Sequence, residues 1–199
     1  MPAPTLYYLR HGETVWNAEG RLQGHRDSDL TERGRAQADH CGAILHRLAT
    51  RGAYDPAAFD YVASPLGRAR ATMERVRSVL GLDPAGYRTD GRLAEMSFGD
   101  WEGLTFVEVR ARKPEVLAAR ERDLWHFAPP GGESYTDLIG RVREWHTSLV
   151  RDTVVVAHGG TARALFALLN VASRENATRA AVAQGVVYHF VGGQMSRHE

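Results

Sequence analysis

The 199-residue sequence has one cysteine, Cys41, no long apolar run and almost no net charge. A single cysteine excludes an internal disulfide framework and a multi-cysteine zinc site, and it fits a reducing compartment. Because Cys41 falls on the apolar face of an expected helix, we interpret it as a small buried hydrophobe and not as a reactive thiol. No apolar run approaches the roughly 20 residues that a membrane-spanning helix needs, so we expect no membrane partner.

Charges of the two signs nearly cancel. The chain carries 25 Lys and Arg against 24 Asp and Glu, for a formal net charge of +1. This balance argues against nucleic acid as a main partner. Residues 1–4 contain neither a basic segment nor an apolar core of the kind that targeting leaders have, so we expect a cytoplasmic protein.

The sequence alternates expected strands with expected helices. Short apolar runs predict strands at 5–9, 60–63, 153–157 and 186–191, the last one followed by a polar tail. Helical periodicity or capping residues predict helices at 31–52, from Ser64-Pro65 to 79, from 105, at 114–125, from 134 and at 162–169. We therefore expect an α/β protein, one domain over residues 1–199, with a mostly parallel central sheet covered by helices on both faces.

Several strands end in residues suited to chemistry. His11 follows the first strand, Arg68 lies near the start of the helix after the second, and His158 follows the strand 153–157. Ligands in such sheets bind beyond the carboxyl ends of the strands, and a cation near a helix N-terminus is better explained if an anion binds there. Taken singly, two of these residues have an ordinary structural explanation. His11 could belong to a polar turn, and Arg68 could be a surface arginine.

Motifs around these residues follow one another along nearly the whole chain. They are Leu9-Arg10-His11-Gly12-Glu13-Thr14 with Asn17, Leu22-Gln23-Gly24, Leu30-Thr31-Glu32-Arg33-Gly34, Ser64-Pro65-Leu66-Gly67-Arg68-Ala69-Arg70-Ala71-Thr72, Leu93-Ala94-Glu95 with Phe98-Gly99-Asp100-Trp101-Glu102-Gly103, Gly131-Gly132-Glu133-Ser134, and Val156-Ala157-His158-Gly159-Gly160. In this set and order the sequence resembles the histidine phosphatase superfamily, also called the phosphoglycerate mutase-like family. The resemblance implies a three-layer α/β/α fold.

The resemblance also implies roles for particular residues. His11 would attack phosphorus and become a transient phosphohistidine, and Glu95 would serve as general acid and base. Arg10, Arg68 and His158 would surround the phosphoryl group, with His158 protonated beside the anion. The remaining phosphate-binding residues carried over from the family are Asn17, Gln23, Gly24 and Gly159.

Neither a metal nor another cofactor is expected. The histidines lack a metal-ligand spacing, and no Gly-Lys-Ser or Gly-Lys-Thr phosphate loop is present. The expected partners are a small phosphorylated metabolite and the inorganic phosphate released from it, and a homodimer is possible.

Within the family, the sequence favours a phosphomonoester hydrolase. The position that matches the mutase lysine is Phe106, and Trp125-His126 replaces the paired arginines expected of mutases. Three alternatives stay open at this point: a cofactor-dependent phosphoglycerate mutase, an alpha-ribazole phosphatase, and an inactive member that binds phosphorylated ligands. Residues 104–132 and the tail after Val191 are expected to set the substrate.

Overall fold

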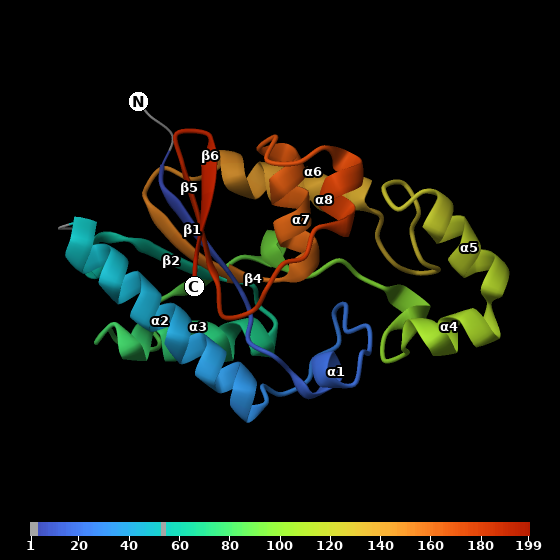
Figure 1. Cartoon of the computed structure of the whole chain (residues 1–199), viewed down its shortest axis with the longest axis horizontal. Helices are drawn as coiled ribbons and strands as arrows, with labels where there is room; N and C mark the ends of the chain where they lie inside the picture. The colour runs from blue at the N-terminus through green and yellow to red at the C-terminus, as the bar shows by residue number, and fades with distance from the viewer. Residues whose placement is uncertain (1–3, 53–54) are drawn as a thin grey trace.

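The structure is a computed structural model that describes residues 4–52 and 55–199 (Figure 1). The expectation about a targeting leader concerns residues 1–4, and residues 1–3 lie outside the described residues. The described strands form one six-stranded sheet in the order β3-β2-β4-β1-β5-β6. They are β1 (Leu6–Arg10), β2 (Asp60–Ala63), β3 (Arg88–Thr89), β4 (Thr153–Ala157), β5 (Val187–Val191) and β6 (Gln194–His198).

Four strands are parallel and two are not. β1, β2, β3 and β4 run in one direction, while β5 pairs antiparallel with β1 and β6 antiparallel with β5. The expected mostly parallel sheet is therefore confirmed. The antiparallel pair closes the edge of the sheet beyond β1.

Helices cover both faces of the sheet and also form a separate hairpin. In Figure 1, α2 and α3 lie side by side across one face, α6 and α7 cover the other, and α4 with α5 stands apart. The α-helices are α1 (Val15–Ala18), α2 (Glu32–Gly52), α3 (Gly67–Val79), α4 (Phe106–Arg112), α5 (Pro114–Arg122), α6 (Tyr135–Thr147), α7 (Gly159–Leu168) and α8 (Arg174–Arg179), and the short 3-10 helices are η1 (Pro56–Ala58), η2 (Gly91–Leu93) and η3 (Gly99–Trp101).

Alternation along the strands divides the core into two layers. In β1, Leu6 and Tyr8 pack with α6 and α7, whereas Tyr7 and Leu9 pack against α2 and α3. Cys41 lies in the second layer, as expected, and burial raises the pKa of its thiol to about 12. The layers confirm the predicted α/β/α architecture.

Local signals predicted several helix starts correctly and missed other elements. Capping boxes begin α4 at Thr105 and α6 at Ser134, as the sequence indicates. The helices α1 and α8 and the two-residue strand β3 lie in stretches that show no sustained period. Each of these elements is so short that its sequence cannot show a repeating hydrophobic pattern.

Two expectations about the chain are wrong. Ser64 does not cap α3, because the helix begins two residues later, after Leu66, without a side-chain cap. The residues after Val191 are not an irregular tail but strand β6, which pairs with β5. Gly192 and Gly193, both with positive φ, turn the chain between these strands.

Within residues 4–52 and 55–199, no helix combines the length and the apolar character that crossing a membrane requires.

Candidate active site

Three neighbouring strands deliver the central side chains. Arg10 at the end of β1 is level with Ala157 at the end of β4, and the His11 backbone N–H donates to the Ala157 carbonyl at 2.9 Å. His11 and His158 therefore leave adjacent strands at the same height, and their ring centroids are 5.1 Å apart. On the other side of β4, the Ser64 N–H donates to Val156 at 2.9 Å.

The hydrogen bonds of His11 determine its tautomer. Its Nδ1 lies 2.8 Å from the Gly12 carbonyl oxygen, which only accepts, so Nδ1 carries the proton and Nε2 carries the lone pair. Burial, with the nearby Arg68 and Arg10 guanidiniums, holds the pKa of His11 well below its usual range. A nucleophilic histidine needs a fixed acceptor for the proton on its other ring nitrogen. In His11 this acceptor is the backbone carbonyl of the next residue, Gly12.

His158 is a neutral donor among the protein's own groups. Burial and the charge of Arg68 hold its pKa well below the usual value among the protein's own groups, and the expected protonation of His158 beside a bound anion stays a prediction. Its Nε2 lies 2.7 Å from Ser64 Oγ, and that oxygen already accepts the Leu66 N–H at 3.3 Å. When the Ser64 hydroxyl donates to Nε2, the His158 proton lies on Nδ1, where a phosphoryl oxygen can accept it.

Unpaired buried nitrogens gather at this point. Arg10 Nε, Arg68 Nε and His158 Nδ1 are buried and form no hydrogen bond within the described protein. Such donors are costly unless a ligand satisfies them, and three of them beside a neutral imidazole suit a phosphoryl group. The residues that the sequence proposes as the phosphate site are thus brought together.

The two arginines are held firmly. Arg68 Nη2 donates to the Gly24 carbonyl at 2.8 Å, and its Nη1 pairs with Asp27 at 3.0 Å. Arg10 Nη1 donates to the Val182 carbonyl at 2.8 Å. Because their outer nitrogens are engaged in this way, both Nε groups stay fixed.

Glu95 approaches from a loop. Its Oε2 accepts the Gly160 N–H of α7 at 3.1 Å, and its Oε1 accepts the Met96 N–H at 2.9 Å. The loop itself is clamped by Arg141, which donates to the carbonyl of Glu95 and pairs with Glu133 at 2.9 Å. Glu95 thus reaches the α7 N-terminus beside His158.

The remaining predicted residues lie around the centre with different contacts. Asn17 Oδ1 accepts from Gln184 at 3.0 Å, and Gln23 Nε2 donates to Thr14 at 2.8 Å. Gly24 orients Arg68 through its carbonyl. Gly159 lies beside Arg10, since a Cβ at Gly159 would be 3.7 Å from Arg10 Nε. Gly12 packs against the backbone of Gly34, where a Cβ at Gly12 would collide with the Gly34 carbonyl.

Sequence reasoning missed supporting residues. Tyr8 donates its hydroxyl to the His158 carbonyl at 2.7 Å, Ser64 fixes the His158 ring, and Asp27 pairs with Arg68. Arg141 was recognised only as part of a helix. The sequence does offer one indication that Ser64 belongs to the site, since Ser64 follows a strand as directly as His11 does. The Ser-Pro pair, however, favours a role as helix N-cap for this residue.

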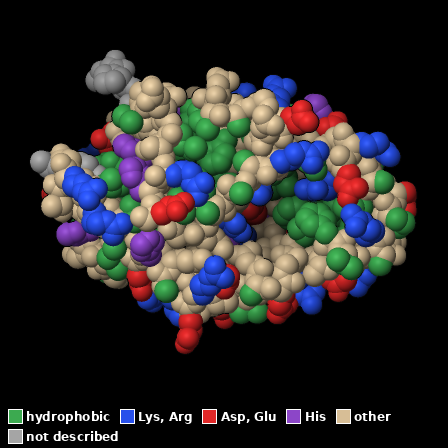
Figure 2. All heavy atoms as spheres, in the orientation of Figure 1, with side chains coloured by type: hydrophobic (Ala, Val, Ile, Leu, Met, Phe, Trp, Pro, Cys, Tyr) green, Lys and Arg blue, Asp and Glu red, His purple; other side chains and the backbone are tan. Residues whose placement is uncertain are grey.

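Two of the three residues that depart from the mutase pattern, Phe106 and Trp125, each lie under an arginine. Arg120 covers the Phe106 ring at 4.9 Å, and Arg174 covers Trp125 at 5.3 Å. Figure 2 shows Lys and Arg side chains on the rim of a hollow that lies between α7, α1 and the α4–α5 hairpin. Among the residues that the structure describes, no group of three His, Cys, Asp or Glu could hold a metal ion.

An α/β sheet whose central strands end in a neutral histidine amid arginines has the groups that phosphoryl transfer requires. The family model of the histidine phosphatase superfamily (branch 1) matches residues 6–195. The chain therefore belongs to this superfamily.

Three relatives illustrate the similarity. The chain is 38% identical over 183 residues to a glucosyl-3-phosphoglycerate phosphatase of Mycobacterium tuberculosis, covering 85% of this chain and 76% of the relative. It is 35% identical to a 2,3-bisphosphoglycerate-dependent phosphoglycerate mutase of Azorhizobium caulinodans, covering 90% and 88%. The crystal structure of the alpha-ribazole phosphatase from Shigella flexneri is similar with a TM-score of 0.79 and 28% identity, covering 98% and 94%.

Proposed function

We propose that this protein hydrolyses phosphomonoesters through a phosphohistidine on His11, with Glu95 as general acid and base. The observation that carries the proposal is the neutral His11 ring, whose Nδ1–H is bound by Gly12 and whose Nε2 is free, beside three unpaired buried donors. A lone pair on nitrogen and fixed donors for the equatorial oxygens are what in-line phosphoryl transfer requires.

The reaction proceeds in two balanced steps. His11 Nε2 forms a bond to phosphorus while the ester P–O bond breaks, and the Glu95 carboxyl gives its proton to the departing oxygen. Glu95, now a carboxylate, takes a proton from water, and the water oxygen displaces Nε2 from phosphorus. The products are the alcohol and inorganic phosphate, and both catalytic groups return to their starting states.

Arg10, Arg68 and His158 stabilise the charge that develops on the phosphoryl oxygens. Each offers a buried N–H that is fixed before the substrate arrives, so little reorganisation is needed during the reaction. Lysine would be a poor replacement at Arg68, because its flexible ammonium cannot reproduce the fork held by Gly24 and Asp27.

A phosphoglycerate mutase is the second candidate, since relatives with that name are also similar to this chain. Phe106 and Trp125-His126 provide no cation at the positions where mutases are expected to carry them. Comparison of 2- and 3-phosphoglycerate interconversion with phosphate release distinguishes the two reactions, and we expect phosphate release to be faster.

The substrate is a small phosphorylated metabolite of the cytoplasm. The single cysteine supports this assignment, because it fits a reducing compartment, and the names of the relatives supply glucosyl-3-phosphoglycerate and alpha-ribazole phosphate as members of a first panel.

The test is hydrolysis of p-nitrophenyl phosphate and of this panel with chelator present. We expect turnover, and an acid-labile phosphoryl adduct on His11 that mass spectrometry detects after rapid alkaline quenching. His11→Ala should abolish turnover and adduct, while His46→Ala, a change at an exposed histidine of α2, should preserve them. Phosphate binding without turnover of any ester would establish an inactive binding member instead.

A further inference from the structure

A buried arginine of α3 faces a surface cavity that the proposed reaction does not use. Arg77 lies in the last turn of this helix, is 7% exposed and lines a cavity of about 300 Å³. The other walls of the cavity come from η1, the start of β2, the loop after α3 and the start of β3.

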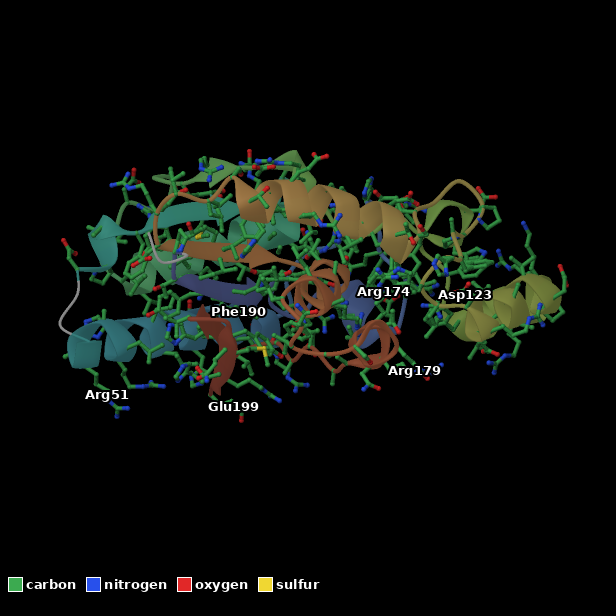
Figure 3. All side chains as sticks on the ribbon, turned by 90° about the horizontal axis from the view of Figure 1, so that it is seen from above. Arg51, Asp123, Arg174, Arg179, Phe190 and Glu199 are labelled. Carbon is green, nitrogen blue, oxygen red and sulfur yellow. The ribbon has the colours of Figure 1, made fainter. Side chains whose placement is uncertain are left out.

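The cavity lies at the opposite end of the sheet from the phosphoryl site. The first two residues of β2 line it, whereas Ser64 follows the last residue of this strand. Arg77 is nine residues along α3 from Arg68, which corresponds to about 14 Å of helix. In Figure 3, Arg51, near the end of the helix that precedes η1 and β2 in the chain, lies at one end of the molecule and Asp123 at the other. A ligand in this cavity is therefore not part of a substrate held at the phosphoryl site.

The guanidinium of Arg77 is held in place, but its charge has no partner. It lies over the Tyr61 ring at 4.4 Å, and its Nε donates to the Asp83 carbonyl at 2.7 Å. Its Nη2 lies close to the backbone of Gly86, since a Cβ there would be 2.6 Å from this nitrogen. Within the described part of the chain, Arg77 forms no ion pair and neither Nη1 nor Nη2 donates to a protein group. Two fixed nitrogens are thus available to a ligand.

The carboxylates beside the cavity are bound to other groups. Asp60 pairs with Arg88 at 2.8 Å, and Asp83 Oδ1 accepts the Ala85 N–H at 3.1 Å. A buried charge without a partner costs free energy, and the aromatic ring beneath the guanidinium offsets only part of that cost. A carboxylate in the cavity would supply the missing partner, because a guanidinium can bind both of its oxygens through parallel N–H groups.

Apolar side chains form the wall beside the guanidinium. Phe59, Leu82 and Tyr87 line the cavity and pack on the core layer of α2 and α3. The Tyr87 hydroxyl donates to Glu74 at 2.9 Å, which fixes this ring further. A cavity of this volume suits a small molecule with an apolar body. A single unpaired cation matches one negative charge, so it fits a carboxylate better than a phosphomonoester, whose charge near neutral pH approaches two.

We propose that this cavity is a binding site for a small carboxylate with an apolar body, whose oxygens are held by Arg77 and whose body lies on the wall formed by Phe59, Leu82 and Tyr87. The inference does not depend on the proposed hydrolysis, because the two sites share no residue.

The test compares benzoate with benzamide, which has the same ring and nearly the same shape but no charge. Vanadate is added first, so that the phosphoryl site is filled. Binding is followed by the amide NMR signals of Gly86 and Arg88, which lie at the cavity. We expect benzoate to shift these signals with a Kd at least fivefold lower than that of benzamide, because only the carboxylate forms charge-assisted hydrogen bonds with Arg77.

Arg77→Gln should raise the Kd of benzoate at least fivefold. Arg75→Gln removes the same charge from the same helix, at a side chain that pairs with Asp39, and it should leave the Kd unchanged. Ala85→Glu keeps the core intact, because Ala85 is exposed where it lines the cavity, and its added carboxylate should weaken benzoate binding at least fivefold without changing benzamide binding. Equal affinity for benzoate and benzamide, absence of shifts at Gly86 and Arg88, or a preference for benzoate that survives both Arg77→Gln and Ala85→Glu would overturn the proposed site.

Discussion

The Ser64 hydroxyl, by donating to Nε2 of His158, would fix the tautomer of this histidine with its proton on Nδ1. Ser64→Ala removes this donor to Nε2, so we expect the proton of His158 to distribute between Nδ1 and Nε2. The loss of one oriented hydrogen bond should lower kcat/KM and weaken vanadate binding about three- to tenfold.

Nitrogen-15 NMR of the imidazole distinguishes the tautomers directly. Ser78→Ala removes an exposed hydroxyl of α3 that binds the Glu74 carbonyl, and it should leave both the tautomer and vanadate affinity unchanged. A wild-type His158 spectrum and rate in Ser64→Ala would show that the hydroxyl has no such role.

At this scale the sequence could identify the reacting residues but not their protonation. His11, Arg10, Arg68, Glu95 and His158 are found by motif, and the structure brings them together. The neutral state of His158 depends on burial and on the field of Arg68, both of which arise only when separate segments meet. The roles of Asn17 and Gln23 stay predictions.

Among the elements, the loop that carries Glu95 depends on a close approach of two backbones. Gly99 has φ of +52°, and a Cβ there would collide with the carbonyl of Pro130 and the backbone of Gly131 and Gly132. Gly99→Ala should therefore lower the free energy of unfolding by about 1–3 kcal/mol and displace the loop, with a reduced kcat.

Gly91→Ala is the matched control, since Gly91 lies in η2 on the same connection and a Cβ there meets nothing within 4 Å. Urea unfolding should place this variant within about 0.5 kcal/mol of the wild type. Equal stability of the two variants would contradict the proposed constraint at Gly99.

The elements themselves were predictable where hydrophobic period or caps were strong, as in α2, α4, α6 and β4. The sequence does not predict the edge strand β6. Most of its side chains are exposed, so it shows no alternation of apolar and polar residues. The Gly192-Gly193 pair is the feature of the sequence that indicates β6, since two glycines between an apolar and a polar run favour a two-residue hairpin turn.

For the whole molecule, two buried neutral histidines make stability depend on pH. The pKa values of His11 and His158 lie well below 6.5 in the folded protein and return to about that value on unfolding. Their contribution is fully present above pH 6.5 and is lost as the pH falls below it, because the unfolded chain then binds protons that the folded site does not.

Between pH 7 and 5.5 we expect the pair to lower the free energy of unfolding by about 2–3 kcal/mol, measured by urea unfolding in phosphate-free buffer. His11→Asn should remove roughly half of this decrease, whereas His46→Asn should leave it intact. The half-buried His146 and His189, whose pKa values are also lowered, contribute equally in all three proteins. A decrease of the same size in His11→Asn would contradict the assignment.

The composition and the alternation of strands and helices along the chain are sufficient to predict the α/β class. They do not predict the direction of the last strands, which is set by turns and edge pairing. The single domain and the homodimer stay predictions.

The register of β1 with β4 has a consequence for biosynthesis. Arg10 and Ala157 are level in the sheet although 146 residues separate them in the sequence. At about 5–20 residues per second, the ribosome adds β4 roughly 7–30 seconds after β1. During that interval the apolar β1 lacks both of its partner strands, so its side chains wait for the sheet until the C-terminal part of the chain has been made.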